Sequence, residues 1–159
     1  MKNRLFKNYK YSFVARYDSE GRPEYEYKYI GDDISGTDYD VATVQWGNGA
    51  RMPTRIDMED LLKKCIWTPG PYNNVNGAYV TGPNGNEIFL PFAGWYDAGG
   101  LTGNGINSSL WSGSLSISSD AWAFGCLLQE GNLGYDGGTI MRYHGRSIRP
   151  VKDKESIED

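Results

Sequence analysis

Side chains that could carry out catalysis are few in this chain and far apart. His144 is the sole histidine and stands just before Gly145 in a predicted surface turn, where we expect a solvated imidazole rather than a catalytic one. Cys65 and Cys126 could form one bridge, but two small buried apolar side chains are the favoured interpretation. No motif places a Ser/His/Asp arrangement, and no spacing of carboxylates points to glycoside hydrolysis. The sequence therefore predicts a protein that is not an enzyme.

Metal-binding side chains are equally dispersed. There is no CxxC pair and no cluster of His and Cys, so a zinc site is not expected. Calcium-dependent lectins gather Glu, Asn and Asp in motifs such as Glu-Pro-Asn or Trp-Asn-Asp, and neither motif occurs here. The acidic groups Asp32, Asp33 and Asp97 are scattered along the chain. We expect no metal and no cofactor.

Aromatic and small polar residues, by contrast, gather in the C-terminal half, and such residues suit recognition of a glycan or a protein. Trp95-Tyr96-Asp97 opens a Gly-rich stretch, residues 97–107, that we predict to be a long loop. Trp111 begins a predicted strand at the end of this loop. The candidate ligand-binding residues are Trp95, Tyr96, Asp97, Asn107, Trp111, Trp122, Tyr135, Tyr143 and His144.

Composition sets the class of protein. A chain of 159 residues supports one domain with a real core, and 14% aromatic residues with 21 glycines favour a compact, loop-rich fold. The net charge of −4 argues against a nucleic-acid partner, which requires basic patches. No run approaches the ~18 apolar residues of a membrane span. The basic residues 1–7 precede no apolar segment, so we expect no secretory signal in this chain.

Two short helices are predicted near the middle of the chain. Thr37 or Asp38 is expected to cap the first, with residues 41–42 and 44–46 facing inward and Gly47 ending it. Thr54 is expected to cap the second, with Asp57 three residues later as in a capping box. Pro53 separates the second helix from the preceding segment. Met58, Leu61, Leu62 and Cys65 form one apolar face of the second helix.

Most of the remaining chain is predicted to be β structure. Residues 9–17 and the alternating Tyr25, Tyr27 and Tyr29 are predicted strands, joined by a turn at residues 19–23. Residues 78–81 and 87–90 flank an Asn-Gly turn, which predicts a hairpin. Further strands are expected at residues 109–112, 121–128, 139–143 and 147–151. The rings of Trp46 and Trp67 are expected in the core.

Several motifs together resemble the domain family known as Fibrobacter succinogenes major paralogous domains, which is common in gut Bacteroidetes. The matching segments lie at residues 34–42, 51–54, 76–77, 80–86, 88–91, 93–94, 111–112 and 145–151. The resemblance implies an α+β, C-type-lectin-like fold over residues 30–151, with residues 1–29 as an N-terminal strand region and residues 152–159 as a disordered charged tail. It also implies an exported or cell-surface, extracellular protein, while the expected glycan or protein ligand rests on the aromatic and Gly-rich residues described above.

The same resemblance bears on two arginines and on the oligomeric state. Contact of Arg51 and Arg149 with an acidic ligand is one interpretation. The favoured one is that both are partly buried and bind loop carbonyls or acidic groups near the helices. We find no counterpart of the strand that usually opens the family's fold. An unpaired sheet edge at that place would favour a homodimer.

Two alternatives to a fixed binding module remain open. C-type-lectin-like domains are common targets of diversity-generating retroelements, and the pairs Gly125-Cys126, Tyr135-Asp136 and Tyr143-His144 are permitted outcomes of such diversification. Formylglycine-generating oxidases share this general fold and an Arg-x-Pro-Thr helix start, here residues 51–54. They require a reactive cysteine pair near the C-terminus, which this sequence lacks.

Overall fold

The computed structural model describes residues 12–97, 99–119, 122–129 and 139–153. Within these residues, two short helices and twelve strands follow one another along the chain. In order they are β1 (Ser12–Tyr17), β2 (Pro23–Tyr27), α1 (Val41–Trp46), β3 (Ala50–Arg51), α2 (Arg55–Lys64), β4 (Ile66–Tyr72), β5 (Val75–Thr81), β6 (Glu87–Pro91), β7 (Ala93–Asp97), β8 (Gly100–Asn104), β9 (Asn107–Leu115), β10 (Trp122–Gln129), β11 (Thr139–Met141) and β12 (Val151–Lys152). The α+β class predicted from sequence is confirmed.

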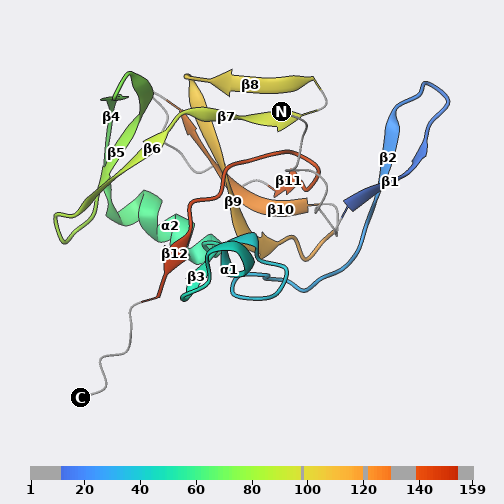
Figure 1. Ribbon diagram of the computed structural model, residues 1–159, viewed down its shortest axis with the longest axis horizontal. Helices are drawn as coiled ribbons and strands as arrows, with labels where there is room; N and C mark the ends of the chain where they lie inside the picture. Colours follow the sequence, from blue (N-terminus) through green and yellow to red (C-terminus); the bar gives the residue numbers. More distant parts are fainter. Residues whose placement is uncertain (1–11, 98, 120–121, 130–138, 154–159) are drawn as a thin grey trace, which may run out of the picture.

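The strands form four separate sheets. The largest has the order β11-β10-β9-β7-β8, and a second sheet has the order β4-β5-β6. Two small sheets pair β12 with β3 and β1 with β2. Figure 1 shows the β1–β2 ribbon projecting from one side of the molecule, while β4, β5 and β6 lie at the opposite side. None of the described helices is long and apolar enough to cross a membrane.

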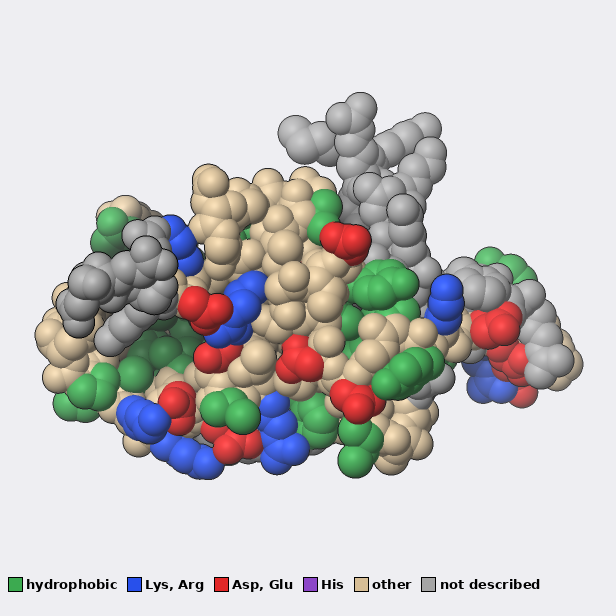
Figure 2. Space-filling model, turned by 90° about the horizontal axis from the view of Figure 1, so that it is seen from below, with side chains coloured by type: hydrophobic (Ala, Val, Ile, Leu, Met, Phe, Trp, Pro, Cys, Tyr) green, Lys and Arg blue, Asp and Glu red, His purple; other side chains and the backbone are tan. Residues whose placement is uncertain are grey.

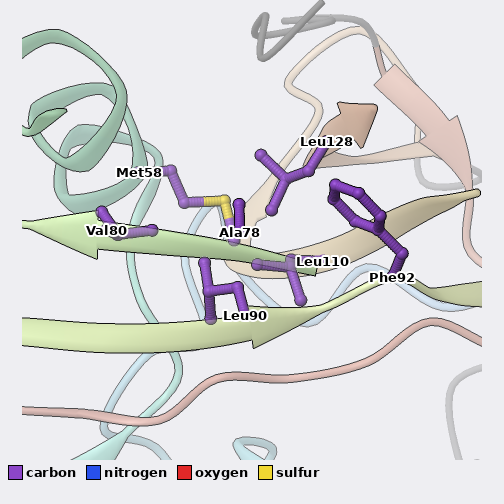
Figure 3. Close-up of a cluster of buried hydrophobic side chains, with 7 residues drawn as sticks. All are labelled: Met58, Ala78, Val80, Leu90, Phe92, Leu110 and Leu128. Carbon is purple, nitrogen blue, oxygen red and sulfur yellow. The ribbon is translucent and has the colours of Figure 1, made fainter. Parts of the chain in front are cut away.

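Two apolar clusters lie on opposite faces of β9. Leu110 joins the first cluster and its neighbour Trp111 joins the second, because successive strand residues point to opposite faces. The first cluster brings together side chains from α2, β5, β6, β9 and β10 (Figure 3), and its buried members are Met58, Ala78, Val80, Leu90, Phe92, Leu110 and Leu128. The second consists of Ile34, Ala42, Met52, Trp111, Leu115 and Ala123. The central sheet is therefore covered on both faces.

Helix α2 forms as its sequence predicts. The hydroxyl of Thr54 accepts a hydrogen bond from the backbone N–H of Asp57 at 3.1 Å, and the Asp57 carboxylate accepts one from the Thr54 N–H at 2.8 Å. This reciprocal pair is the predicted capping box. The apolar face of α2 packs on the first cluster, where Cys65 is a free thiol. Acidic and basic side chains alternate over the face of the molecule that carries the helices (Figure 2).

Helix α1 departs from prediction in its cap and in its buried face. Asp40, not Thr37 or Asp38, is the N-cap, because its carboxylate accepts from the N–H groups of Ala42 and Thr43. Ala42 alone is buried within the helix, and the Trp46 ring, expected in the core, is 55% exposed. A helix of fewer than two turns has room for only one inward position. The helix does end at Gly47, as predicted.

Two segments rich in Gly and Pro form strands that were not predicted. Residues 97–107 are not a long loop but contain β8, which pairs with β7 between tight turns at positive-φ glycines. Strand β4 carries Pro69 and Pro71, residues that usually argue against a strand. Both prolines are accommodated because β4 is the edge strand of its sheet. The side of β4 that faces away from β5 has no neighbouring strand, so its residues need no backbone N–H to donate.

The predicted hairpin around the Asn-Gly turn is confirmed as β5 and β6. The predicted closing strand is shorter than expected, because within residues 147–151 Ser147 makes only a single bridge and β12 begins at Val151. Lys152 and Asp153, assigned to a disordered tail, instead pair with β3 and bind Arg51 respectively. Residues 154–159 lie outside the described part of the chain.

Candidate functional site

The candidate ligand-binding face is built where β7 and β9 separate. These two strands are paired in parallel only at Gly94 and Ser108. Beyond that point the late segment 145–147 lies between them. Gly145 exchanges two backbone hydrogen bonds with Tyr96, at 2.7 and 2.8 Å, and Ser147 accepts one from the Trp111 N–H at 2.9 Å. Backbone pairing thus fixes the turn before Gly145 beside the end of β7.

This pairing brings five of the predicted residues to the end of β7, where Trp95 and Asp97 point to one side of the strand and Tyr96 points to the other. Trp95, Tyr96 and Asp97 end β7, and Tyr143 and His144 occupy the adjoining turn. Tyr96 is 49% exposed, whereas the other four are partly buried. His144 is partly buried, and the ring of Tyr143 packs against it edge-on at 4.5 Å.

Arg146 joins these side chains, although sequence reasoning did not select it. Its guanidinium lies 5.7 Å from the ring centroid of Trp95 and 5.4 Å from that of Trp111, within the range of cation–π contacts. Its Nη2 atom is also 3.5 Å from Nδ1 of His144. Arg146 follows Tyr143, His144 and Gly145 directly in the sequence, and this position could have marked it as a candidate site residue. Its contacts with Trp95 and Trp111 could not be predicted, because they depend on the strand pairing.

The charges at this place set the state of His144. Burial lowers the pKa of the imidazole, and the positive charge of Arg146 lowers it further. The carboxylate of Asp97 acts in the opposite direction but does not compensate. His144 is therefore neutral at pH 7, and the described face combines aromatic rings with one cation and one carboxylate.

Trp111 does not belong to an exposed face. Its side chain is only 3% exposed and packs in the second apolar cluster, because it points toward the residues of the 34–52 segment from the central strand. Asn107 is partly buried, and its amide fills the space above Gly103. Trp122 begins β10 opposite Met141, and Tyr135 lies outside the described residues.

Arg51 has the structural role predicted for it. Its side chain is mostly buried and forms ion pairs of 2.6 Å with both Asp57 and Asp153, and it donates to the Met52 carbonyl at 3.2 Å. These partners raise its pKa and keep it charged. Pro53 is buried beside it. Arg149 was expected to be partly buried in the same way, but it is exposed.

Replacing Arg51 with methionine is expected to lower the free energy of unfolding by about 1–3 kcal/mol, because the Asp57 carboxylate loses a charged donor. Arg51→Lys should recover little of this lost stability, because a lysine ammonium lacks the planar set of N–H donors with which arginine binds both carboxylates. Asp153→Ala should change stability by less than about 0.5 kcal/mol because that carboxylate is exposed. Urea unfolding of the three variants measures these differences, and equal losses for all three would contradict the expected role of the Arg51–Asp57 pair.

A shallow depression of about 320 Å³ lies elsewhere, between α1 and the β3–β12 pair. Its lining residues are Gly36, Thr43, Gly47, Asn48, Gly49, Ala50, Arg51 and Asp153. None of the predicted ligand-binding residues borders it. Among the described residues, His, Cys, Asp and Glu form no group of three that could hold a metal ion.

Comparisons with known proteins add no relative to this description. The chain matches no protein-family model, no curated protein and no solved structure.

Proposed function

We propose that this chain is a non-catalytic ligand-binding domain of C-type-lectin-like fold, belonging to an exported or cell-surface protein. Its ligand is a glycan or a protein, bound at the exposed face formed by the end of β7 and the turn at residues 143–146. The motif resemblance to Fibrobacter succinogenes major paralogous domains supports this proposal, as does the order of two short helices followed by curled sheets. Trp95, Tyr96, Asp97, Tyr143 and His144 are the proposed contact residues.

One observation carries the proposal: the paired hydrogen bonds between Tyr96 and Gly145. They join two segments that are far apart in sequence and bring Trp95, Tyr96, Tyr143 and His144 to the same end of β7, with Tyr96 on the opposite side of the strand from Trp95. Rigid aromatic side chains that expose both apolar and polar atoms are efficient contact residues, because little conformational entropy is lost on binding. The sheet behind them holds the backbone fixed, which lowers the cost of ordering a binding site.

A broad glycan array, probed with and without a chelator, tests the ligand class. Binding that survives the chelator would support a calcium-independent lectin. Loss of signal with the chelator would contradict the expected absence of a metal. Absence of binding would favour a protein ligand and the diversified-binder alternative, and the neighbouring DNA should then be searched for a near-copy of codons 94–148.

Replacing Tyr96 with alanine is expected to weaken binding of any ligand found on the array by more than about 1 kcal/mol, because Tyr96 is the exposed aromatic ring among the proposed contact residues. The melting temperature should change little. Trp95→Ala and Tyr143→Ala should also weaken binding, but Trp95 packs on Arg146, so part of its effect will be on stability.

Tyr17→Ala provides the matched control, because Tyr17 is a similarly exposed tyrosine on the projecting β1–β2 ribbon. Isothermal titration of the four variants and the unchanged protein, combined with thermal unfolding, separates effects on affinity from effects on stability. Unchanged affinity in Tyr96→Ala would remove this face from consideration.

A further inference from the structure

A second group of aromatic side chains lies on the three-stranded sheet, away from the face proposed above. Tyr72 on β4, Tyr79 on β5 and Phe89 on β6 form a continuous row. The Phe89 ring centroid is 5.4 Å from that of Tyr72 and 5.2 Å from that of Tyr79. Cross-strand pairing places these side chains on the outer face, opposite Ala78, Val80 and Leu90 of the first cluster. We call these three rings the aromatic row.

Two members of the aromatic row have a structural reason to be where they are. The Phe89 ring covers Gly77, where a β-carbon would collide with the ring and with the Leu90 carbonyl. The Tyr79 ring covers Gly70, with 3.6 Å to the place that a β-carbon would occupy. Aromatic rings that cover cross-strand glycines stabilise sheets. The hydroxyl of Tyr79 also donates to the Pro71 carbonyl at 3.0 Å, which fixes the ring.

Tyr72 has no such reason. It covers no glycine of the sheet, and 53% of its surface is exposed. It extends the row toward solvent and widens the aromatic surface beyond what the glycines require. The result is a stepped platform, with interplanar angles of 44° and 60° between neighbouring rings.

Charge and edge chemistry restrict what this platform could bind. Residues 66–91, which include the whole sheet and its turns, contain a single charged side chain, Glu87, whose carboxylate accepts from the Thr81 hydroxyl at 3.1 Å. There is accordingly no cation in this segment to attract an acidic partner. A peptide strand added to β4 would need backbone donors at the edge, and Pro69 and Pro71 supply none.

The turns of the same sheet supply neutral hydrogen-bonding groups instead. Exposed asparagines occupy both of them, at Asn73, Asn74, Asn84 and Asn86. Each carries an amide that can donate and accept. A pyranose ring matches this combination, because its C–H face can lie on an aromatic ring while its hydroxyls bond with amides.

We propose that the aromatic row is a second binding surface, which takes the sugar rings of an uncharged polysaccharide. The exposed ring of Tyr72, extended by the partly buried Phe89, attracts the weakly positive C–H groups of a pyranose, and residues 66–91 supply no cation to attract acidic chains. This surface is independent of the face at β7, because the two lie on different sheets.

Native gel electrophoresis through soluble polysaccharides tests the proposal. The probes are a β-glucan, an arabinoxylan and a galactomannan, with polygalacturonate as the charged comparison. At least one uncharged polymer should retard the protein, and polygalacturonate should not. Tyr72→Ala should weaken the retarding association roughly fivefold or more, the equivalent of losing one good contact residue. Tyr72→Phe keeps the ring and should retain most of the association.

Tyr17→Ala is the matched control and should migrate as the unchanged protein does. Tyr96→Ala is run beside it to tell the two proposed faces apart. Because Tyr72 is exposed, its variants should fold normally, which circular dichroism verifies. The proposal is overturned if no uncharged polymer retards the protein, or if Tyr72→Ala is retarded as strongly as the unchanged protein. Loss of retardation only in Tyr96→Ala would also overturn it and would place the glycan at the β7 face.

Discussion

Replacing Asp40 with alanine is expected to lower the free energy of unfolding by about 3 kcal/mol or more, because its carboxylate organises buried backbone from two segments. The side chain is fully buried. It accepts hydrogen bonds from the N–H groups of Gly36, Ala42 and Met52 at 2.7–2.9 Å, and from the hydroxyl and N–H of Thr43 at 2.9 and 3.3 Å. Alanine leaves these donors without an acceptor, and equilibrium unfolding in urea measures the loss.

The dependence on pH provides an independent check. Burial alone would raise the pKa of Asp40, but the hydrogen bonds from Gly36, Met52 and Thr43 outweigh burial and lower it. A lowered folded-state pKa means that the ionised carboxylate stabilises the fold above its ordinary pKa of about 3.9, and that this stabilisation is lost as the pH falls further.

The stability difference between the unchanged protein and Asp40→Asn should consequently be full at pH 7 and shrink below about pH 4. Asparagine fills the same volume, but its NH2 group would face the N–H and hydroxyl donors that now bond to the carboxylate. It should therefore not restore stability at neutral pH. A loss below about 1 kcal/mol in Asp40→Ala at pH 7 would show that the predicted role of the carboxylate is wrong.

Asp40 also illustrates why the first helix was harder to predict than the second. The capping box of α2 is contained in four consecutive residues, and Thr54 and Asp57 therefore identified it from sequence. The cap of α1 depends on Met52, twelve positions later, and on a turn at Gly36. A local pattern cannot distinguish Asp40 from Thr37 or Asp38 when the deciding partner is distant.

The strands follow the same division between local and distant causes. The Asn-Gly turn between β5 and β6 is a local signal, and it was read correctly. Strand β4 was missed because its prolines are tolerated only at a sheet edge, and edge position is a property of the whole fold. Glycines at residues 97–107 indicated a loop, although positive-φ glycines are also what two tight turns around β8 require.

The candidate site was predictable in its residue types but not in its arrangement. Aromatic and polar side chains at the end of β7 and near His144 could be selected because such residues suit binding. That Trp111 points inward, and that Arg146 lies over Trp95, follows from the placement of segment 145–147 between β7 and β9. This pairing joins residues about fifty positions apart and has no local signature.

Gly94 lies at the point where this arrangement begins, and its replacement by alanine is expected to lower the free energy of unfolding by about 3 kcal/mol or more. Gly94 has a φ of +67°, and a β-carbon there would collide with the Thr102 carbonyl and lie 2.8 Å from the Asn104 nitrogen. Both obstacles are backbone of β8, so no side chain can move aside. Alanine must therefore either separate β7 from β8 or displace β7 from Ser108.

Gly85→Ala is the matched control for Gly94→Ala. Gly85 has a similar φ of +77°, but nothing lies within 4 Å of its would-be β-carbon. Gly85→Ala should lower the free energy of unfolding only by the strain of an alanine in the left-handed conformation, about 1–2 kcal/mol. Urea unfolding gives both values, and their difference isolates the collision at β8 from the backbone strain.

Because displacement of β7 also moves Tyr96 away from Gly145, Gly94→Ala should lose ligand binding at the β7 face even under conditions where it remains folded. Equal stability losses in Gly94→Ala and Gly85→Ala would mean that β7 and β8 can move apart without loss of free energy. That result would contradict the rigid placement of Tyr96.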